Sequence, residues 1–252
     1  DAGARYQAHA EIARGAMGVV YRGRDTRFGR PVAIKFLLAE YLARAELRWR
    51  FGEEVRITAA LQHPSVVPVY EAGTCPDGRP YYVMRLVDGQ PLDLLLAARP
   101  DPGHDRSGFL KIFEKVCEAA AFAHARGVIH RDIKPENVMV GALGLVLLMD
   151  WGVAKVLPHS PLGAAADPAA DGEAADDLAE LQTRFGRVLG TPAYMSPEQA
   201  RGFLDQMDER TDVFALGGLL CAILTGQPPY VGADAQSAHK QAARANLAAA
   251  FD

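Results

Sequence analysis

The chain has 252 residues, of which 49% are hydrophobic and 23% are charged, a composition typical of a globular protein with a sizeable core. Its 27 basic and 31 acidic residues give a net charge of −4, which argues against binding to nucleic acid or to an anionic membrane surface. The three scattered cysteines predict neither a disulfide framework nor a zinc site, and no apolar run approaches the roughly 20 residues that span a bilayer.

The first third of the chain predicts a small sheet crossed by one helix. A helix is expected over 40–61, because Pro64 ends it, and a turn is expected at 27–30. Gly89-Gln90-Pro91 follows this part and is a candidate hinge between two lobes. Runs rich in β-branched and aromatic residues predict strands at 19–21, 32–37, 66–70 and 81–87.

The remainder of the chain predicts mainly helices. Ser107 is a candidate N-cap of a helix with apolar residues at i, i+3 and i+4, and Gly127 closes this helix. Thr211 is a candidate cap of a second apolar helix, which is expected to end at Gly226.

Two short apolar runs, 138–140 and 145–149, flank a glycine-containing turn and predict a hairpin. Its second strand would deliver Asp150 to a cleft between the lobes. Residues 158–180, by contrast, are rich in alanine and acidic residues and contain no lysine or arginine. Such a stretch buries too little apolar surface to offset its ordering entropy, so we expect it to be mobile.

Glycines near the N-terminus suggest a phosphate-binding loop. In the run Gly15-Ala16-Met17-Gly18, glycine lets backbone N–H groups approach a phosphate with no side chain in the way. Considered alone, the run is explained equally well by an ordinary glycine turn. The following Val19 and Val20 favour the phosphate loop, because they predict a returning strand whose valine covers a bound adenine.

Lys35 ends the apolar strand Val32-Ala33-Ile34-Lys35, a place where a lysine is normally a solvated charge. Glu54, on the predicted helix over 40–61, is a candidate partner. An ion pair between the two would direct the Lys35 ammonium at the α- and β-phosphates of ATP. The alternative is that Glu54, like its neighbour Glu53, is a solvated helix carboxylate.

The run HRDIKPEN, which begins at His130, carries the strongest chemical signal. Asp132 would accept or orient the proton of a substrate hydroxyl, and Lys134 would neutralise charge on the transferred phosphate. Asn137 and Asp150 would hold Mg²⁺, because amide and carboxylate oxygens suit a hard octahedral cation. Asp132 alone could be a turn carboxylate, but its spacing to Asn137 and Asp150 favours the catalytic interpretation.

The same order of segments continues along the chain, with the runs ARGAMGVVY, VAIK, LQHPSVV, HRDIKPENVMV, LMDWGVAK, GTPAYMSPEQARG and TDVFALGGLLCAILTGQPPY. From Tyr6 to Tyr230 they resemble the catalytic domain of a eukaryotic-type (Hanks-type) bacterial Ser/Thr protein kinase. The resemblance implies an α+β, bilobal fold. A small β-rich N-lobe with one helix would occupy 1–88, and a larger, mainly helical C-lobe would occupy 89–252, with the activation segment at 150–198. The family continues for two or three more helices, so C-terminal helices are expected to be missing.

The resemblance also implies an ATP site. Met84 would be the gatekeeper behind the adenine, and Val20 and Ala33 would contact the nucleotide. The backbone of Arg85 and Val87 would bond the adenine edge. The expected activity is transfer of the γ-phosphoryl group of MgATP to Ser or Thr hydroxyls of proteins, with autophosphorylation in a homodimer. A cytoplasmic location is expected, and the abrupt ends leave open a larger, membrane-anchored protein.

Two residues depart from the family pattern. Ala13 stands at the first glycine position of the loop, which implies weaker nucleotide affinity. Trp151 replaces the usual phenylalanine, and the tryptophan is expected to bury an aromatic ring in the same way. An alternative is therefore a catalytically weak, nucleotide-binding pseudokinase or scaffold domain. A small-molecule kinase of the aminoglycoside or choline type is disfavoured by the segment that ends in Ser196-Pro197-Glu198, a platform for protein substrates.

The resemblance assigns supporting roles as well. Arg131 implies control by phosphorylation of the activation segment, with Thr183 and Ser160 as candidate sites. Asp212 is expected to anchor the backbone of the catalytic loop. Glu198 is expected to have no partner, because the arginine that pairs with it in the family would follow the last residue of this chain.

Overall fold

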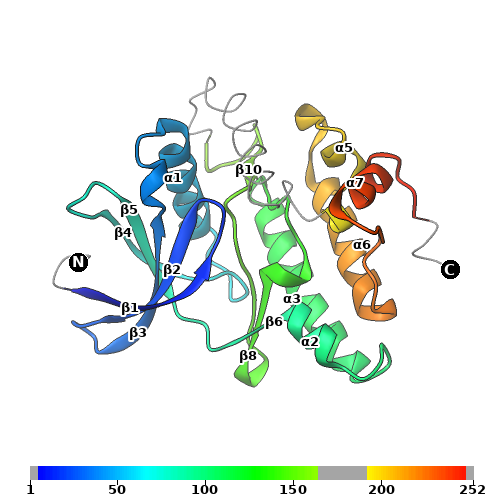
Figure 1. Ribbon diagram of the computed structural model, residues 1–252, viewed down its shortest axis with the longest axis horizontal. Helices are drawn as coiled ribbons and strands as arrows, with labels where there is room; N and C mark the ends of the chain where they lie inside the picture. The colour runs from blue at the N-terminus through cyan, green and yellow to red at the C-terminus, as the bar shows by residue number, and fades with distance from the viewer. Residues whose placement is uncertain (1–4, 164–191, 248–252) are drawn as a thin grey trace.

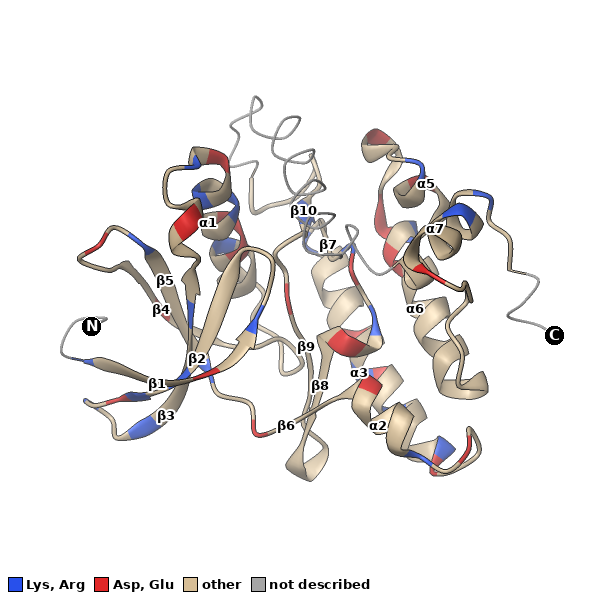
Figure 2. Cartoon of the chain, viewed as in Figure 1, with Lys and Arg blue, Asp and Glu red and all other residues tan. Residues whose placement is uncertain are grey.

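The computed structural model describes residues 5–163 and 192–247. A small β-sheet with one long helix lies beside a larger, mainly helical part (Figure 1). The predicted α+β, bilobal arrangement is thus confirmed. Residues of both charge signs are spread over both parts (Figure 2). Among the described residues, no helix has both the length and the apolar character needed to cross a membrane.

The small part is built on one antiparallel sheet with the strand order β1-β2-β3-β5-β4. The strands predicted at 19–21 and 32–37 are confirmed, and Gly29, with φ of 68°, closes the turn between them. The strand predicted at 66–70 begins later, because Val66 bonds back to the His63 carbonyl in a turn. The strands are β1 (Tyr6–Arg14), β2 (Gly18–Asp25), β3 (Arg30–Leu37), β4 (Val69–Thr74) and β5 (Pro80–Arg85).

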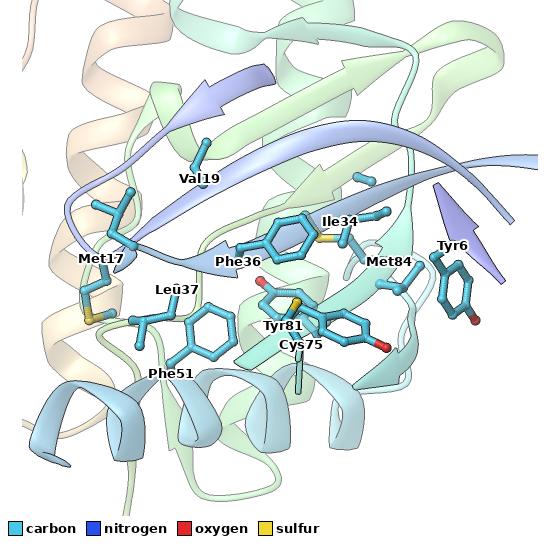
Figure 3. Packing of buried hydrophobic residues seen from close by; sticks show 14 of the residues in the cluster. Tyr6, Met17, Val19, Ile34, Phe36, Leu37, Phe51, Cys75, Tyr81 and Met84 are labelled. Carbon is cyan, nitrogen blue, oxygen red and sulfur yellow. The ribbon is translucent and has the colours of Figure 1, made fainter. Parts of the chain in front are cut away.

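A single long helix, α1 (Ala45–Ala60), packs against this sheet. The prediction of a helix over 40–61 was wrong at its start, where a short 3-10 helix, η1 (Ala39–Tyr41), precedes α1. Buried residues of α1 recur at spacings of three and four, which defines the face turned toward the sheet. Met17, Leu37 and Phe51 lie close together between sheet and helix (Figure 3).

The helix α1 contributes to both hydrophobic cores of the molecule. Leu47 and Phe51 belong to the core under the sheet, whereas Ile57, together with Leu61 at the C-cap of the helix, belongs to the core of the helical part. Each fully buried side chain of this size stabilises the folded state by about 2 kcal/mol. Movement of α1 therefore disturbs packing in both parts.

The helical part contains α2 (Leu92–Ala98), α3 (Arg106–His124), α5 (Pro197–Ala200), α6 (Glu209–Thr225) and α7 (Ala235–Ala243). The predicted N-caps were wrong. Asp105 caps α3 by accepting from the Gly108 N–H at 3.3 Å, and Asp208 caps α6, so Ser107 and Thr211 lie inside their helices. The end of α6 at Gly226, with φ of 80°, is confirmed.

Short strands and turns complete the helical part. The predicted hairpin at 138–149 is confirmed as β8 (Val138–Gly141) and β9 (Val146–Leu148). The candidate hinge Gly89-Gln90-Pro91 forms the strand β6 (Gly89–Pro91), which pairs with β8, and its role as a hinge stays a prediction. The remaining short elements are β7 (Val128–Ile129), β10 (Lys155–Val156), η2 (Pro135–Asn137), η3 (Ala142–Gly144), η4 (Pro192–Tyr194) and η5 (Leu204–Gln206).

Candidate active site

A cavity of about 490 Å³ is lined by residues of the sheet, of α1 and of the catalytic-loop region. Eleven of the predicted site residues line it: Gly15, Ala16, Gly18, Val20, Lys35, Glu54, Met84, Asp132, Lys134, Asn137 and Asp150. Residues far apart in the sequence are therefore brought to one place. Sequence reasoning missed several other lining residues, among them Arg14, Thr58, Val67, Tyr82 and Glu136.

Four predicted nucleotide-binding residues do not line the cavity. The Met17 side chain turns into the core under the sheet and is 7% exposed, because the residue after Ala16 points away from the loop opening (Figure 3). Ala33 lies opposite Met84 in the β3–β5 ladder and is also buried. Arg85 and Val87 were expected to act through their backbone, and this expectation stays a prediction.

The glycine loop joins β1 to β2 in a tight turn. The Gly15 N–H donates to the Gly18 carbonyl at 2.8 Å. A Cβ atom at Gly18 would lie 3.0 Å from the Lys35 side chain and from the Phe36 carbonyl oxygen. Glycine at this position thus lets the loop lie directly over Lys35.

The predicted ion pair between Lys35 and Glu54 is confirmed, with 2.5 Å between Nζ and Oε1. Lys35 projects from β3 and Glu54 from the inner face of α1, where it is 2% exposed. Burial alone would lower the pKa of Lys35, but the charges of Glu54 and Asp150 outweigh burial and raise it. Lys35 is therefore a fixed cation at the wall of the cavity.

The catalytic loop holds Asp132 between two neighbours. Lys134 Nζ lies 2.8 Å from Asp132 Oδ2, and Asn137 Nδ2 donates to the carbonyl oxygen and to Oδ2 of the same residue. Burial raises the pKa of Asp132, and the charge of Lys134 opposes this rise. The carboxylate is thus more basic than a solvated aspartate, which suits acceptance of a hydroxyl proton.

Asp212 fixes the backbone of this loop, as predicted. Its two carboxylate oxygens accept from the backbone N–H groups of His130 and Arg131, each at 2.8 Å, and His124 Nε2 lies 2.8 Å from Oδ2. Arg131 adopts a left-handed conformation with φ of 66°. The buried Asp212 carboxylate stabilises this strained turn because it accepts hydrogen bonds from two backbone N–H groups of the turn.

The His130 ring links the loop to the segment that carries Asp150. The Asp132 N–H donates to His130 Nδ1 at 3.2 Å, so this ring nitrogen is unprotonated and Nε2–H donates to the Met149 carbonyl at 2.9 Å. The buried Trp151 ring packs edge-on against His130, with ring centroids 4.6 Å apart. The predicted burial of an aromatic ring at Trp151 is thus confirmed.

Asp150 follows β9 in a left-handed conformation with φ of 59°, and its Oδ1 lies 3.9 Å from Lys35 Nζ. Burial would raise the pKa of Asp150, but the charges of Lys35 and Lys134 lower it below the usual aspartate range. Its side chain is 56% exposed to the cavity, so it remains an ionised ligand for a cation.

The donor atoms at this place fit a bound Mg²⁺. Both Asn137 amide hydrogens are directed to Asp132, which leaves the amide oxygen as a ligand in the cavity that the Asp150 carboxylate also lines. No cluster of three or more His, Cys, Asp or Glu side chains suited to a metal occurs among the described residues. Magnesium characteristically binds through one or two protein oxygens, and substrate phosphates and water supply its other ligands. The two oxygen donors of Asn137 and Asp150 are therefore enough for this cation.

Of the candidate phosphorylation sites, only Ser160 is described. It is buried, and its hydroxyl donates to the Arg126 carbonyl and accepts from the Leu162 N–H, so modification would require this turn to open. Thr183 lies outside the described residues, as do residues 164–180 of the stretch 158–180 that we expected to be mobile.

Glu198 has a partner, contrary to the prediction. The Thr211 hydroxyl on α6 donates to Glu198 Oε1 at 2.7 Å. Burial would raise the pKa of Glu198, but the hydroxyls of Ser196 and Thr211 lower it. The prediction failed because it considered only an arginine partner, whereas a neutral hydroxyl also satisfies a half-buried carboxylate.

A small sheet with one helix, a larger helical part and a charged cavity between them define the class of bilobal kinases. The sequence profile of the protein kinase domain matches residues 6–251. The chain belongs to the protein kinase domain family.

Bacterial Ser/Thr kinases are among its relatives. The chain is 38% identical over 232 residues to serine/threonine-protein kinase PknB of Mycobacterium leprae, a match that covers 90% of this chain and 33% of that protein. It is 33% identical over 239 residues to serine/threonine-protein kinase PknD of Protochlamydia amoebophila, covering 89% of this chain and 23% of that protein. The chain thus spans a third or less of the length of these curated relatives.

Proposed function

We propose that this chain is the catalytic domain of a protein Ser/Thr kinase, which transfers the γ-phosphoryl group of ATP to Ser or Thr hydroxyls of proteins. One observation carries the proposal. The Lys35–Glu54 pair faces Asp132, Asn137 and Asp150 across a single cavity. Family membership and the names of the similar kinases support it.

Different residues bind the phosphates and the adenine of ATP. Lys35 binds the α- and β-phosphates while Glu54 holds its ammonium in place, and the loop from Gly15 to Gly18 offers backbone N–H groups. Val20 and Met84 line the place for the adenine, and the backbone of residues 85 and 87 holds its edge.

At the reacting end, Asp132 orients the substrate hydroxyl and receives its proton as the hydroxyl oxygen bonds to the γ-phosphorus of ATP. The bond between that phosphorus and the β–γ bridging oxygen breaks, and ADP leaves. Lys134, held beside Asp132, stabilises negative charge on the transferred group. Asn137 and Asp150 hold Mg²⁺, which when bound neutralises charge on the phosphates. Because positioning and electrostatics supply most of this catalysis, the bonds that fix the loop are as important as the groups themselves.

Phosphate transfer from labelled MgATP, to the chain itself and to a basic test protein, tests the proposal. We expect transfer by the unmodified chain and a loss of at least about a hundredfold in Asp150→Asn, because a cation ligand at the phosphates is removed. Asp205→Asn removes the same charge at an exposed position and should leave transfer unchanged. Binding of MgATP without transfer would instead support a pseudokinase or scaffold domain.

Other predictions extend the proposal. We also predict that the boundary between the lobes lies between residues 88 and 89. We further predict autophosphorylation at Thr183 in a homodimer, and a cytoplasmic location. Mapping the labelled residue in the transfer assay tests Thr183. The dependence of autophosphorylation rate on protein concentration tests whether two copies must meet.

A further inference from the structure

Tyr82 lies in the cavity but in none of the sequence motifs that pointed to catalysis. On β5 it pairs directly with Lys35 of β3, so both side chains project from the same face of the sheet toward α1. The Tyr82 hydroxyl donates to Glu54 Oε1 at 2.7 Å, the same oxygen that accepts from Lys35 Nζ at 2.5 Å. Its ring packs on Phe51 of α1, with centroids 5.6 Å apart.

The contact between Tyr82 and Glu54 is buried, and the Tyr82 hydroxyl keeps its proton. Tyr82 is 3% exposed and Glu54 is 2% exposed. Burial, together with the Glu54 charge, raises the pKa of Tyr82 well above its usual value of 10, so the phenol remains a hydrogen-bond donor at physiological pH. Glu54 Oε2 has no hydrogen-bond partner among the described residues. Oε1 therefore accepts both hydrogen bonds to this carboxylate, from Lys35 and from Tyr82.

We infer that Tyr82 is a positioning residue, which acts through Glu54 to hold Lys35 toward the phosphates of ATP. The inference rests on the proposed kinase function. If α1 moved away from the sheet, Tyr82 and Lys35 would both lose their acceptor, and an unpaired buried donor is costly. The Tyr82 hydroxyl therefore shifts the equilibrium toward the arrangement in which Lys35 faces Asp150 and the cavity.

A comparison of the affinities for MgATP and for adenosine distinguishes this positioning role from a general effect on the fold. MgATP needs Lys35, whereas adenosine has no phosphates. In Tyr82→Phe, we expect MgATP affinity, measured by calorimetry, to fall roughly tenfold, as for loss of a hydrogen bond to a charged group. Adenosine affinity should stay unchanged, and the KM for ATP should rise more than kcat falls.

Tyr81→Phe is the matched control. Tyr81 is the neighbouring residue on β5, is also buried, and packs against Phe36 with centroids 5.8 Å apart. This variant removes a hydroxyl from the same strand without touching Glu54. Both affinities should match those of the unmodified chain.

A second background makes the test specific for Glu54. In Glu54→Ala, the Tyr82 hydroxyl has no carboxylate to hold, so adding Tyr82→Phe should change MgATP affinity no further. The inference is overturned if the loss persists in this background, if adenosine binding weakens equally, or if MgATP affinity does not change. A Tyr82→Phe protein that fails to fold would assign the hydroxyl to overall stability and also overturn it.

The proposed function and this inference fail separately. An unmodified chain that binds MgATP but transfers no phosphate contradicts the kinase function, while the ratio of MgATP to adenosine affinity still decides the role of Tyr82. Normal transfer with no change in that ratio overturns the role of Tyr82 alone. An unmodified chain that binds no MgATP overturns both.

Discussion

At the scale of single residues, the proposed function predicts that the environment of Asp132 sets the pH range of phosphate transfer. The acid form cannot accept a proton, so kcat/KM should fall as pH drops through the pKa of Asp132. Burial places this value above the usual aspartate range of about 4. Because Lys134 favours the carboxylate, Lys134→Gln should move the acid limb to higher pH as well as lower kcat.

The pH profile of kcat/KM checks this prediction. Lys115→Gln, which removes a positive charge from an exposed ion pair on α3, should leave the acid limb where it is. An acid limb that stays in place in Lys134→Gln would show that another group controls the profile.

At the scale of elements, the start of α3 depends on Asp105. This residue holds a left-handed conformation with φ of 45° while its side chain caps the helix. Asp105→Ala loses the cap and should lower the free energy of unfolding by about 1 kcal/mol. Asp105→Asn keeps a capping oxygen and tolerates the conformation, so it should lose much less.

Urea denaturation of the variants measures these differences. Ser107→Ala is the natural comparison, because Ser107 was the predicted cap and lies within the helix. We expect its stability to match that of the parent. If Ser107→Ala cost more than Asp105→Ala, the assignment of the cap would be contradicted.

The sequence predicts those elements whose pattern is local. Buried β-branched runs indicated β2 and β3, and short apolar runs around a glycine indicated β8 and β9. β1 was missed, because after Tyr6 its residues are exposed and show no alternation of burial. The caps failed because several polar residues stand side by side before α3 and α6, and only the backbone conformation selects one of them.

The site was predicted where chemistry fixes spacing along the chain. Lys35, Asp132, Asn137 and Asp150 were expected at one site from their sequence context alone, and the structure places all four around one cavity. Tyr82 could not be identified in this way, because a tyrosine in an apolar strand is indistinguishable from an ordinary core residue until α1 places Glu54 against it. Contacts between distant segments carry no local signal.

At the scale of the whole molecule, α1 makes the two parts interdependent. Trp49 stands near the start of α1, and Trp151 lies in the core of the helical part. Trp49→Phe and Trp151→Phe each leave one fluorescent reporter. Within each variant, we expect the fluorescence of the remaining tryptophan and the far-UV circular dichroism to show the same unfolding midpoint, because α1 cannot leave one core without exposing the other.

A core substitution at the shared helix extends this test. Leu61 is 2% exposed and packs in the core of the helical part, so Leu61→Ala should cost about 3 kcal/mol. The loss should be reported equally by Trp49 and Trp151. Two separate midpoints, or a loss seen by Trp151 alone, would mean that the parts unfold independently.

The adjacent tyrosines of β5 have a consequence for the evolution of this strand. A one-residue slip of β5 against β3 exchanges the faces of all its side chains, so Tyr81 would take the place of Tyr82 opposite Lys35. The same slip would put Val83 opposite Ala33 in place of Met84. A single-residue insertion in the turn before β5 would therefore preserve a phenol beside Glu54 and exchange a methionine for a smaller valine at the wall of the cavity. Such an insertion offers a route to a wider cavity without any substitution.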